Sequence, residues 1–114
     1  TTTLEKLKGL GLKIQVTELD ISVYPKEHGR RERKPEDADA NYTAEREAKQ
    51  IEMYKMIFGV FRKYKNVLTG VTFWNISDGN SWLDNFPVPG RKDYPLLFDK
   101  DLKPKKAFGE VVKF

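Results

Sequence analysis

Two short apolar runs, separated by a long helical pattern, constrain the fold of this chain more than any other feature. The runs cover residues 12–18 and 70–74, and each has the length and composition of a β-strand. Apolar residues at helical spacing lie between them, within residues 41–64: Ile51, Tyr54, Ile57, Phe58, Phe61 and Tyr64. Two strands joined through a helix can pair in parallel, because a parallel connection has to cross over the sheet. The pattern therefore predicts an α/β unit.

Two further helices are expected at the ends of the chain. The first covers residues 3–9, where Thr2-Thr3-Leu4-Glu5 has the form of a capping box and Gly9 supplies the stop. The last starts near Pro104, because proline suits the first helical turn. It is expected to bury Ala107, Phe108, Val111 and Val112. The predicted order is helix, strand, helix, strand, helix. Two parallel strands cannot pair their outer edges or cover both faces of a sheet, so we expect this chain not to be self-sufficient.

Two carboxylates follow the apolar part of the first strand. On a strict two-residue period, Glu18 and Asp20 point to the same side. The simplest interpretation is a polar strand end that meets solvent. The alternative is that the two acids face a cleft or a cation.

Two tryptophans mark the end of the second strand and the loop after it. Trp74 ends the strand, and Trp82 follows eight residues later in a loop rich in Asn, Asp and Ser. Indole rings stack on the apolar faces of sugars, although tryptophan is also common in protein cores. If the strands are parallel neighbours, the acids and the indoles meet at one edge of the sheet. In a (β/α)8 barrel that edge forms the mouth of the active site.

Three segments, in order, resemble glycoside hydrolase family 10, a family of retaining endo-β-1,4-xylanases with a (β/α)8 barrel. Residues 14–22, reading IQVTELDIS, resemble the strand that carries the nucleophile. Residues 71–99 resemble the eighth strand and its loop, and residues 102–108 resemble the last helix. The resemblance implies that residues 1–114 are a partial catalytic domain, the C-terminal quarter of the barrel from helix 6 through strand 7, helix 7 and strand 8 to helix 8. A complete barrel needs about 250 residues, so a complementary N-terminal fragment is the expected partner.

The resemblance also implies roles for individual residues. Glu18 matches the nucleophile, and Asp20 matches an acid that orients a histidine of the preceding strand, outside this chain. Trp74 matches the floor of the subsite at the cleaved bond. Trp82 matches an indole that closes over the glycone side and helps to exclude a hydroxymethyl group. The family's acid/base lies in an Asn-Glu motif, which this sequence lacks. The isolated chain is therefore expected to be inactive.

Further expectations follow from the resemblance and from composition. The substrate is expected to be xylan or a xylo-oligosaccharide, cleaved without a cofactor or metal ion by an enzyme that is secreted. No cysteine is present and His28 is the only histidine, so a thiolate or multi-histidine metal site cannot be built from this chain. His28 is expected to lie in a solvated loop.

Charge and hydropathy bear on partners. The net charge is +4, but acids interleave the basic residues 30–34, a pattern that does not favour nucleic acid. No apolar run approaches the roughly 18 residues that cross a membrane. Arg91 and Lys92 are candidates for contact with a distal sugar or glucuronyl branch, with solvent exposure as the default.

Three functional hypotheses remain open from sequence. The first is part of a xylanase that is active only when the barrel is completed. The second is a related barrel glycosidase that acts on β-1,4-glucans, which relative rates on xylan and cellulose would distinguish. The third is a non-catalytic quarter-barrel module that assembles or binds sugar, which would not be labelled by a fluorinated xylobioside.

Overall fold

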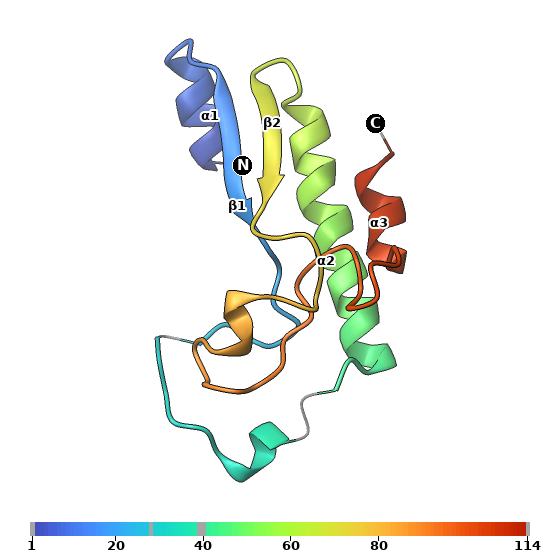
Figure 1. Cartoon of the computed structure of the whole chain (residues 1–114). Helices are drawn as coiled ribbons and strands as arrows, with labels where there is room; N and C mark the ends of the chain where they lie inside the picture. The colour runs from blue at the N-terminus through green and yellow to red at the C-terminus, as the bar shows by residue number, and fades with distance from the viewer. Residues whose placement is uncertain (1, 28, 39–40, 114) are drawn as a thin grey trace.

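The computed structural model describes residues 2–27, 29–38 and 41–113, so the expectation for His28 lies outside the described residues. Its elements are, in order, α1 (Thr2–Gly9), β1 (Ile14–Leu19), the 3-10 turn η1 (Pro35–Ala38), α2 (Ala44–Lys63), β2 (Leu68–Phe73), the 3-10 turn η2 (Trp82–Asp84) and α3 (Lys106–Val111). This confirms the predicted order of helices and strands. The strands lie side by side in Figure 1, and the loops that follow them gather beyond their carboxyl ends.

The two strands pair in parallel, as predicted. Ile14 lies opposite Leu68, and Val16 lies opposite Val71. Within the described part of the chain each strand pairs only with the other, so each leaves its outer edge unpaired. The sheet accordingly lacks the neighbours that a parallel sheet normally has on both sides.

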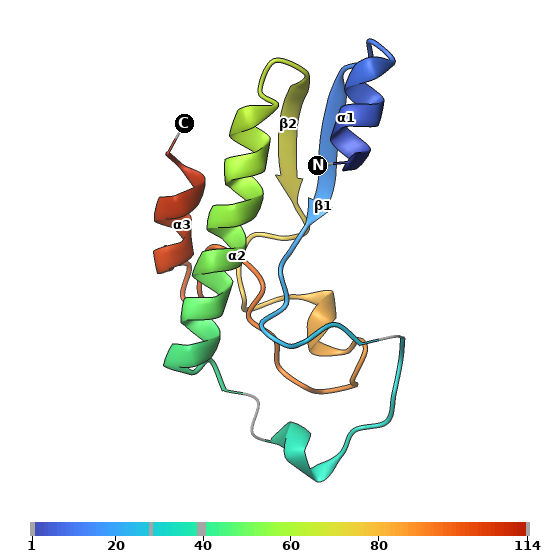
Figure 2. The same ribbon diagram turned by 180° about the vertical axis from the view of Figure 1, so that it is seen from behind.

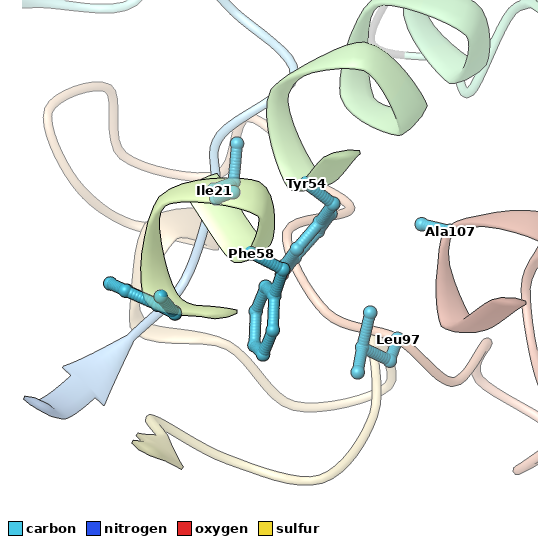
Figure 3. Close-up of a cluster of buried hydrophobic side chains, with 6 residues drawn as sticks. Ile21, Tyr54, Phe58, Leu97 and Ala107 are labelled. Atoms are coloured by element: carbon cyan, nitrogen blue, oxygen red, sulfur yellow. The ribbon is translucent and has the colours of Figure 1, made fainter. Parts of the chain in front are cut away.

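One face of α2 forms the apolar core together with the sheet and the loops. Tyr54, Phe58 and Phe61 are almost fully buried, and the Phe58 ring stacks on Phe73 of β2 with centroids 6.1 Å apart. Ile21, Leu97 and Ala107 complete this cluster from the loops and α3 (Figure 3). Burial of each large apolar side chain contributes about 1.5–3 kcal/mol, so this cluster is the main attachment of α2 to the strands.

α2 begins three residues later than residue 41, where the sequence placed it. The Thr43 hydroxyl accepts a hydrogen bond from the backbone N–H of Arg46 at 3.2 Å, which makes Thr43 the N-cap. The helix continues to Lys63, one residue short of its predicted end. The apolar pattern predicted the helix well because that pattern reports its buried face, whereas the cap decides where it starts.

Two other boundary predictions are wrong. Leu12 is 52% exposed and precedes β1, which begins at Ile14. Val112 is 55% exposed, because α3 ends at Val111 and does not carry Val112 into the core. α3 itself begins at Lys106, two residues after Pro104.

The helices are arranged around the strands in the same way in both views (Figures 1 and 2). α1 lies beside β1, α2 beside β2, and α3 beside α2. The Tyr64 hydroxyl donates to the Glu5 carboxylate and links the end of α2 to α1. Arg62 of α2 donates to the Glu110 carbonyl of α3 at 3.2 Å. None of the described helices is both long and apolar enough to span a membrane.

Candidate active site

The carboxyl ends of β1 and β2 meet at one edge of the sheet. The backbone N–H of Trp74 donates to the Leu19 carbonyl at 2.9 Å, which continues the parallel pairing past the end of β2. Glu18 and Trp74 are therefore on neighbouring strands at the same edge. The structure brings together the two polar strand ends that the sequence had singled out separately.

The backbone of Glu18 departs from regular strand geometry. Between the pairs Val16–Val71 and Leu19–Phe73 the chain advances three residues on β1 and two on β2, so β1 carries one extra residue there. Glu18 lies in this bulge with φ of 58°, a value that is uncommon for a residue other than glycine, and it is exposed. The two-residue period assumed for Glu18 and Asp20 is therefore wrong at this point. Bulges re-aim side chains, and strained residues cluster at functional sites, at a cost of about 1–3 kcal/mol each.

Asn75 marks a second unusual backbone position, directly after Trp74. Its φ is 122°, in the region that favours glycine. Its side-chain oxygen accepts a hydrogen bond from the backbone N–H of Ile76 at 2.8 Å. Asparagine tolerates such turns because its short side chain bonds to the neighbouring backbone. The chain thus turns sharply away from the sheet immediately beyond the Trp74 indole.

The Trp82 indole is held from two sides. Its Nε1–H donates to a carboxylate oxygen of Asp20 at 2.7 Å, and its ring stacks on Phe86 with centroids 5.1 Å apart. Partial burial raises the pKa of Asp20, while the hydrogen bond from Trp82 lowers it, and burial dominates. The sequence indicated both Asp20 and Trp82 but not their contact, and nothing in the sequence indicated the stacking of Phe86.

An open pocket of about 560 Å³ lies between the two indoles. It is lined by Thr72, Phe73, Trp74, Asn75, Asn80, Ser81, Trp82 and Asn85. Trp74 is 48% exposed and Trp82 is 47% exposed, so both rings present a face to solvent. Aromatic faces beside amide and hydroxyl groups can bind the apolar and polar sides of a sugar ring. Glu18 and Asp20 are not among the lining residues.

Arg91 and Lys92 are engaged within the protein. Arg91 is 5% exposed, and its guanidinium pairs with Glu27 at 2.9 Å and lies 3.9 Å from the centroid of the Tyr24 ring. Lys92 pairs with Asp84 at 2.8 Å. The expectation of solvent exposure is wrong for Arg91, because the loops that follow the two strands close over it.

Metal ligands do not gather at the strand ends. In the described ranges no three acidic or histidine side chains come together in a way that could hold a metal ion. The expectation that the site needs neither a metal nor a cofactor stays a prediction.

Comparisons with known proteins give the site a family context. The whole chain, residues 1–114, matches the family model described as glycosyl hydrolase family 10. A β-1,4-xylanase of Dictyoglomus thermophilum is 46% identical over 114 residues, which cover 98% of this chain and 30% of that protein. A thermostable celloxylanase of Thermoclostridium stercorarium is 37% identical and is covered to 27% of its length.

Solved structures agree with this context. A variant enzyme in complex with xylotriose superimposes with a TM-score of 0.86 at 49% identity, over 99% of this chain and 33% of that one. An endo-1,4-β-xylanase of Caldicellulosiruptor owensensis gives a TM-score of 0.78 at 47% identity, over 100% of this chain and 35% of that one. The chain therefore spans about a third of the length of the proteins it matches.

Proposed function

Because the chain belongs to glycosyl hydrolase family 10 and has the fold of part of a TIM barrel, we propose that it supplies the nucleophile and the sugar-binding indoles of a retaining endo-β-1,4-xylanase. The observation that carries the proposal is the meeting of two strand ends. The Glu18 bulge lies beside Trp74 through the Leu19–Trp74 hydrogen bond of 2.9 Å. A carboxylate is one of the two groups that retaining cleavage of a glycosidic bond requires, and exposed aromatic faces beside it can bind the sugar.

Glu18 acts as the nucleophile in this proposal. A retaining glycosidase uses two carboxyl groups about 5–5.5 Å apart, one as nucleophile and one as acid and base. The Glu18 carboxylate attacks the anomeric carbon, the bond to the leaving sugar oxygen breaks, and an ester joins the sugar to Glu18. The acid protonates the departing oxygen, then deprotonates the water that hydrolyses the ester. The exposure of Glu18 and its bulged backbone support this role.

The acid/base comes from residues outside these 114. The sequence contains no Asn-Glu pair of the kind that carries it in the family, and Glu45 and Glu52 are exposed on α2. We propose that α1, β1, α2, β2 and α3 are helix 6 to helix 8 of the barrel, in its C-terminal part. The unpaired outer edges of β1 and β2 would then join the remaining strands. Without them the chain binds sugar weakly and does not hydrolyse it.

Trp74 and Trp82 form the sugar platforms. Trp74 lies directly beyond β2 and would form the floor of the subsite beside Glu18. Trp82 would close the glycone side, where a pentose fits and a hydroxymethyl group does not. A single small group of this kind changes transition-state binding by about 1–3 kcal/mol. Replacing Trp82 by alanine should therefore lower the ratio of xylan to glucan hydrolysis by about tenfold.

A β-1,4-glucanase is the second candidate function. The thermostable celloxylanase among the relatives favours this candidate, because its name refers to both cellulose and xylan. Rates of the completed enzyme on xylan and on a soluble β-1,4-glucan separate the two candidates. A rate on the glucan equal to or above that on xylan would support the second. Secretion of the enzyme remains a prediction under either candidate.

A trapping experiment tests the proposed function. The chain is combined with polypeptide that supplies the other barrel strands, native mass spectrometry establishes the complex, and a 2-fluoro-xylobioside with a good leaving group is added. The fluorine slows hydrolysis of the ester, so the chain should gain the mass of one fluorinated xylobiosyl group at Glu18. Glu18→Gln should remove both the label and the xylanase activity, whereas Glu52→Gln on the exposed face of α2 should retain both.

Either of two results contradicts the proposal. A label on another residue of this chain would replace Glu18 as the nucleophile. A stable complex that binds xylotriose but is never labelled and never cleaves xylan would support a non-catalytic sugar-binding module instead.

A further inference from the structure

Asp93 is a buried carboxylate that the chemistry above does not use. It is 1% exposed and accepts three hydrogen bonds. Two come from the segment that follows β1, from the Ser22 hydroxyl and from the backbone N–H of Val23 at 3.1 Å. The third comes from the backbone N–H of Tyr94 at 2.7 Å. Asp93 therefore ties the continuation of the Glu18 strand to the loop that follows β2.

The backbone of Asp93 makes a second connection, to the turn that carries Trp82. Its N–H donates to the carboxylate of Asp84 at 2.8 Å, and Asp84 also pairs with Lys92 at 2.8 Å. Asp84 is the last residue of η2, and Trp82 is the first. The Ser81 hydroxyl caps this short turn by accepting from the Leu83 N–H at 3.2 Å. The two ends of η2 are thus held by polar contacts.

These contacts close a ring. Asp20 is followed along the chain by Ser22, whose hydroxyl donates to Asp93. The backbone N–H of Asp93 donates to Asp84, at the end of η2. Trp82, at the start of η2, donates its indole N–H back to Asp20. A displacement of the Trp82 indole away from β1 would break the Asp20 contact or one of the bonds made by Asp93 and Asp84.

We propose that Asp93 is a positioning residue, whose carboxylate joins the segment after β1 to the segment that carries Trp82 and so holds the indole at a set distance from Glu18. This inference rests on the proposed function, because the distance between the indole and Glu18 matters only if both act on the same sugar. The position of the indole can nevertheless be tested without catalysis. Asp93 lies outside the lining of the pocket between the two tryptophans, so it acts through Trp82 and does not touch sugar.

A carboxylate suits this task better than an apolar residue. The ionised group has four lone-pair sites and so can accept all three bonds at once. A hydrophobic replacement would leave the Val23 and Tyr94 N–H groups buried without acceptors, each at a substantial cost. Asparagine keeps one acceptor oxygen for the two N–H groups and can donate to Ser22, so it should preserve most of the connection.

The test observes the indole N–H directly. Only this chain, within the completed barrel, is labelled with 15N-tryptophan, so the proton–nitrogen spectrum contains the two indole signals of Trp74 and Trp82, assigned with Trp74→Phe. Because Trp82 donates to Asp20, its indole proton should exchange slowly, and Asp20→Ala gives the reference for a released indole. Asp93→Ala should speed exchange of the Trp82 indole proton about tenfold, whereas Asp93→Asn should stay within about twofold of the parent protein. The Trp74 signal should not change.

A matched control and a second variant keep the test decisive. Asp101→Ala removes an exposed acid elsewhere in the same loop region and should leave both indole signals unchanged. If Asp93→Ala fails to fold by circular dichroism, Ser22→Ala, which removes only one of the three bonds, should speed the exchange about threefold. Exchange of the Trp82 proton within about twofold of the parent protein in the folded variants would overturn the proposal.

Kinetics provide the second measurement. In the completed enzyme, Asp93→Ala should raise KM for xylotriose about fivefold and change kcat less than about twofold, because the indole contributes to binding more than to bond cleavage. An unchanged KM together with unchanged exchange would overturn the positioning role. If the parent enzyme does not cleave xylan at all, the proposed function fails, and the indole exchange still decides the role of Asp93.

Discussion

In the layer formed by α2 and the two strands the buried side chains are apolar except for Gln50, whereas the loops beyond the strand ends bury charged side chains beside apolar ones. Tyr54 and Phe58 are 0% and 3% exposed in the first region. Asp78, Arg91 and Asp93 are between 1% and 5% exposed in the second, and each has hydrogen-bond or ionic partners in the loops or α3. The two regions are therefore held together by different interactions.

The two regions also differ in how fully their side chains are buried or paired. The sheet residues that contact the core, such as Val16, Val71 and Phe73, are only partly buried. An open groove of about 440 Å³ lies along β2 between α2 and α3, and its lining includes Phe58, Leu68 and Val71. The loops pair most of their buried charged groups internally, with the buried Nε of Arg91 left without a hydrogen-bond partner, whereas the layer has apolar surface left over. This contrast is what an incomplete barrel would produce, and it means that partner strands should stabilise the layer more than the loops.

The largest expected effect is in the apolar layer. Phe58→Ala should lower the free energy of unfolding of the completed protein by about 3–5 kcal/mol, because it removes the ring that contacts Tyr54, Phe61 and Phe73. Denaturant unfolding measures the change. Met56→Ala, at a residue that is 60% exposed on the same helix, should cost less than about 1 kcal/mol. Equal costs for the two variants would contradict the assignment of this face as the core.

A somewhat smaller effect is expected from the buried ion pair of the loop region. Lys105 donates to Asp78 at 2.7 Å and to the Tyr94 carbonyl at 2.8 Å. Burial lowers the pKa of Lys105 and raises that of Asp78, and their pairing opposes both shifts. Lys105→Met should destabilise by about 3 kcal/mol, because Asp78 is left buried without its cation.

Two controls sharpen this prediction. Lys106→Met, at a side chain that is 77% exposed, should change unfolding by less than about 1 kcal/mol. Asp78→Asn combined with Lys105→Met should recover roughly half of the loss, because asparagine is neutral and still accepts from the Leu96 N–H. If the double variant is as unstable as Lys105→Met alone, the unpaired charge is not the cause.

Acid should loosen the loop around η1 and leave the apolar layer intact. The guanidinium of Arg31 holds the pKa of Asp37 well below its usual value of 3.8, and Lys34 also donates its N–H to Asp37 at 2.7 Å. The stabilisation is present above that usual value and is lost as the pH falls toward the lower folded value. Amide exchange should show lower protection at Lys34 when the pH falls from about 5 to about 2.5, with α2 amides unaffected.

The opposite shifts elsewhere in the loops make this prediction specific. Burial raises the pKa values of Asp78 and Asp93 in the folded state, so their titration lowers the free energy of unfolding as the pH rises from the usual value of 3.8 through the raised values. Arg31→Gln should weaken the acid dependence at Lys34, because it removes the nearer of the two cations that pair with Asp37 and leaves Arg91 at 3.5 Å. An unreduced dependence in that variant would contradict the role of Arg31.

The smallest effect is expected at the start of α2. Thr43→Ala removes the hydroxyl that accepts from the Arg46 N–H, and it should lower stability by about 1 kcal/mol in thermal unfolding. Thr43→Ser keeps the oxygen and should be close to neutral. A serine variant as unstable as the alanine variant would mean that the methyl group of Thr43, not its cap, carries the effect.

Much of the fold could be predicted because periodicity reports burial. The stripe that includes Tyr54, Phe58 and Phe61 indicated α2, and the parallel pairing followed from the long connection between the strands. Boundaries such as Ala44 and Ile14 were missed by two or three residues, since caps and local exposure decide them. The bulge at Glu18 could not be predicted, because it depends on the register with β2.

The candidate site divides in the same way. Glu18, Asp20, Trp74 and Trp82 were indicated by their positions after two apolar runs and by the family resemblance. The burial of Arg91 was not predicted, since the sequence around a single arginine in a loop does not indicate which residues it contacts. The sequence did not indicate Asp93, because its partner Ser22 is distant in the sequence. It did not indicate Phe86 either, because the stacking of Phe86 on Trp82 occurs within a loop that has no periodic pattern.

The sequence by itself determined the family, the alternation of helices and strands, and the residue types that stand at the two strand ends. Those properties are local, or are carried by motifs that a short segment contains in full. Only the tertiary structure decided that Trp82 donates to Asp20, that Arg91 is enclosed, and that Asp93 joins the segments after β1 and β2. The reason is physical: each of these depends on which side chains a folded backbone brings within hydrogen-bond distance, and loops of irregular conformation set those distances without leaving a repeating pattern in the sequence.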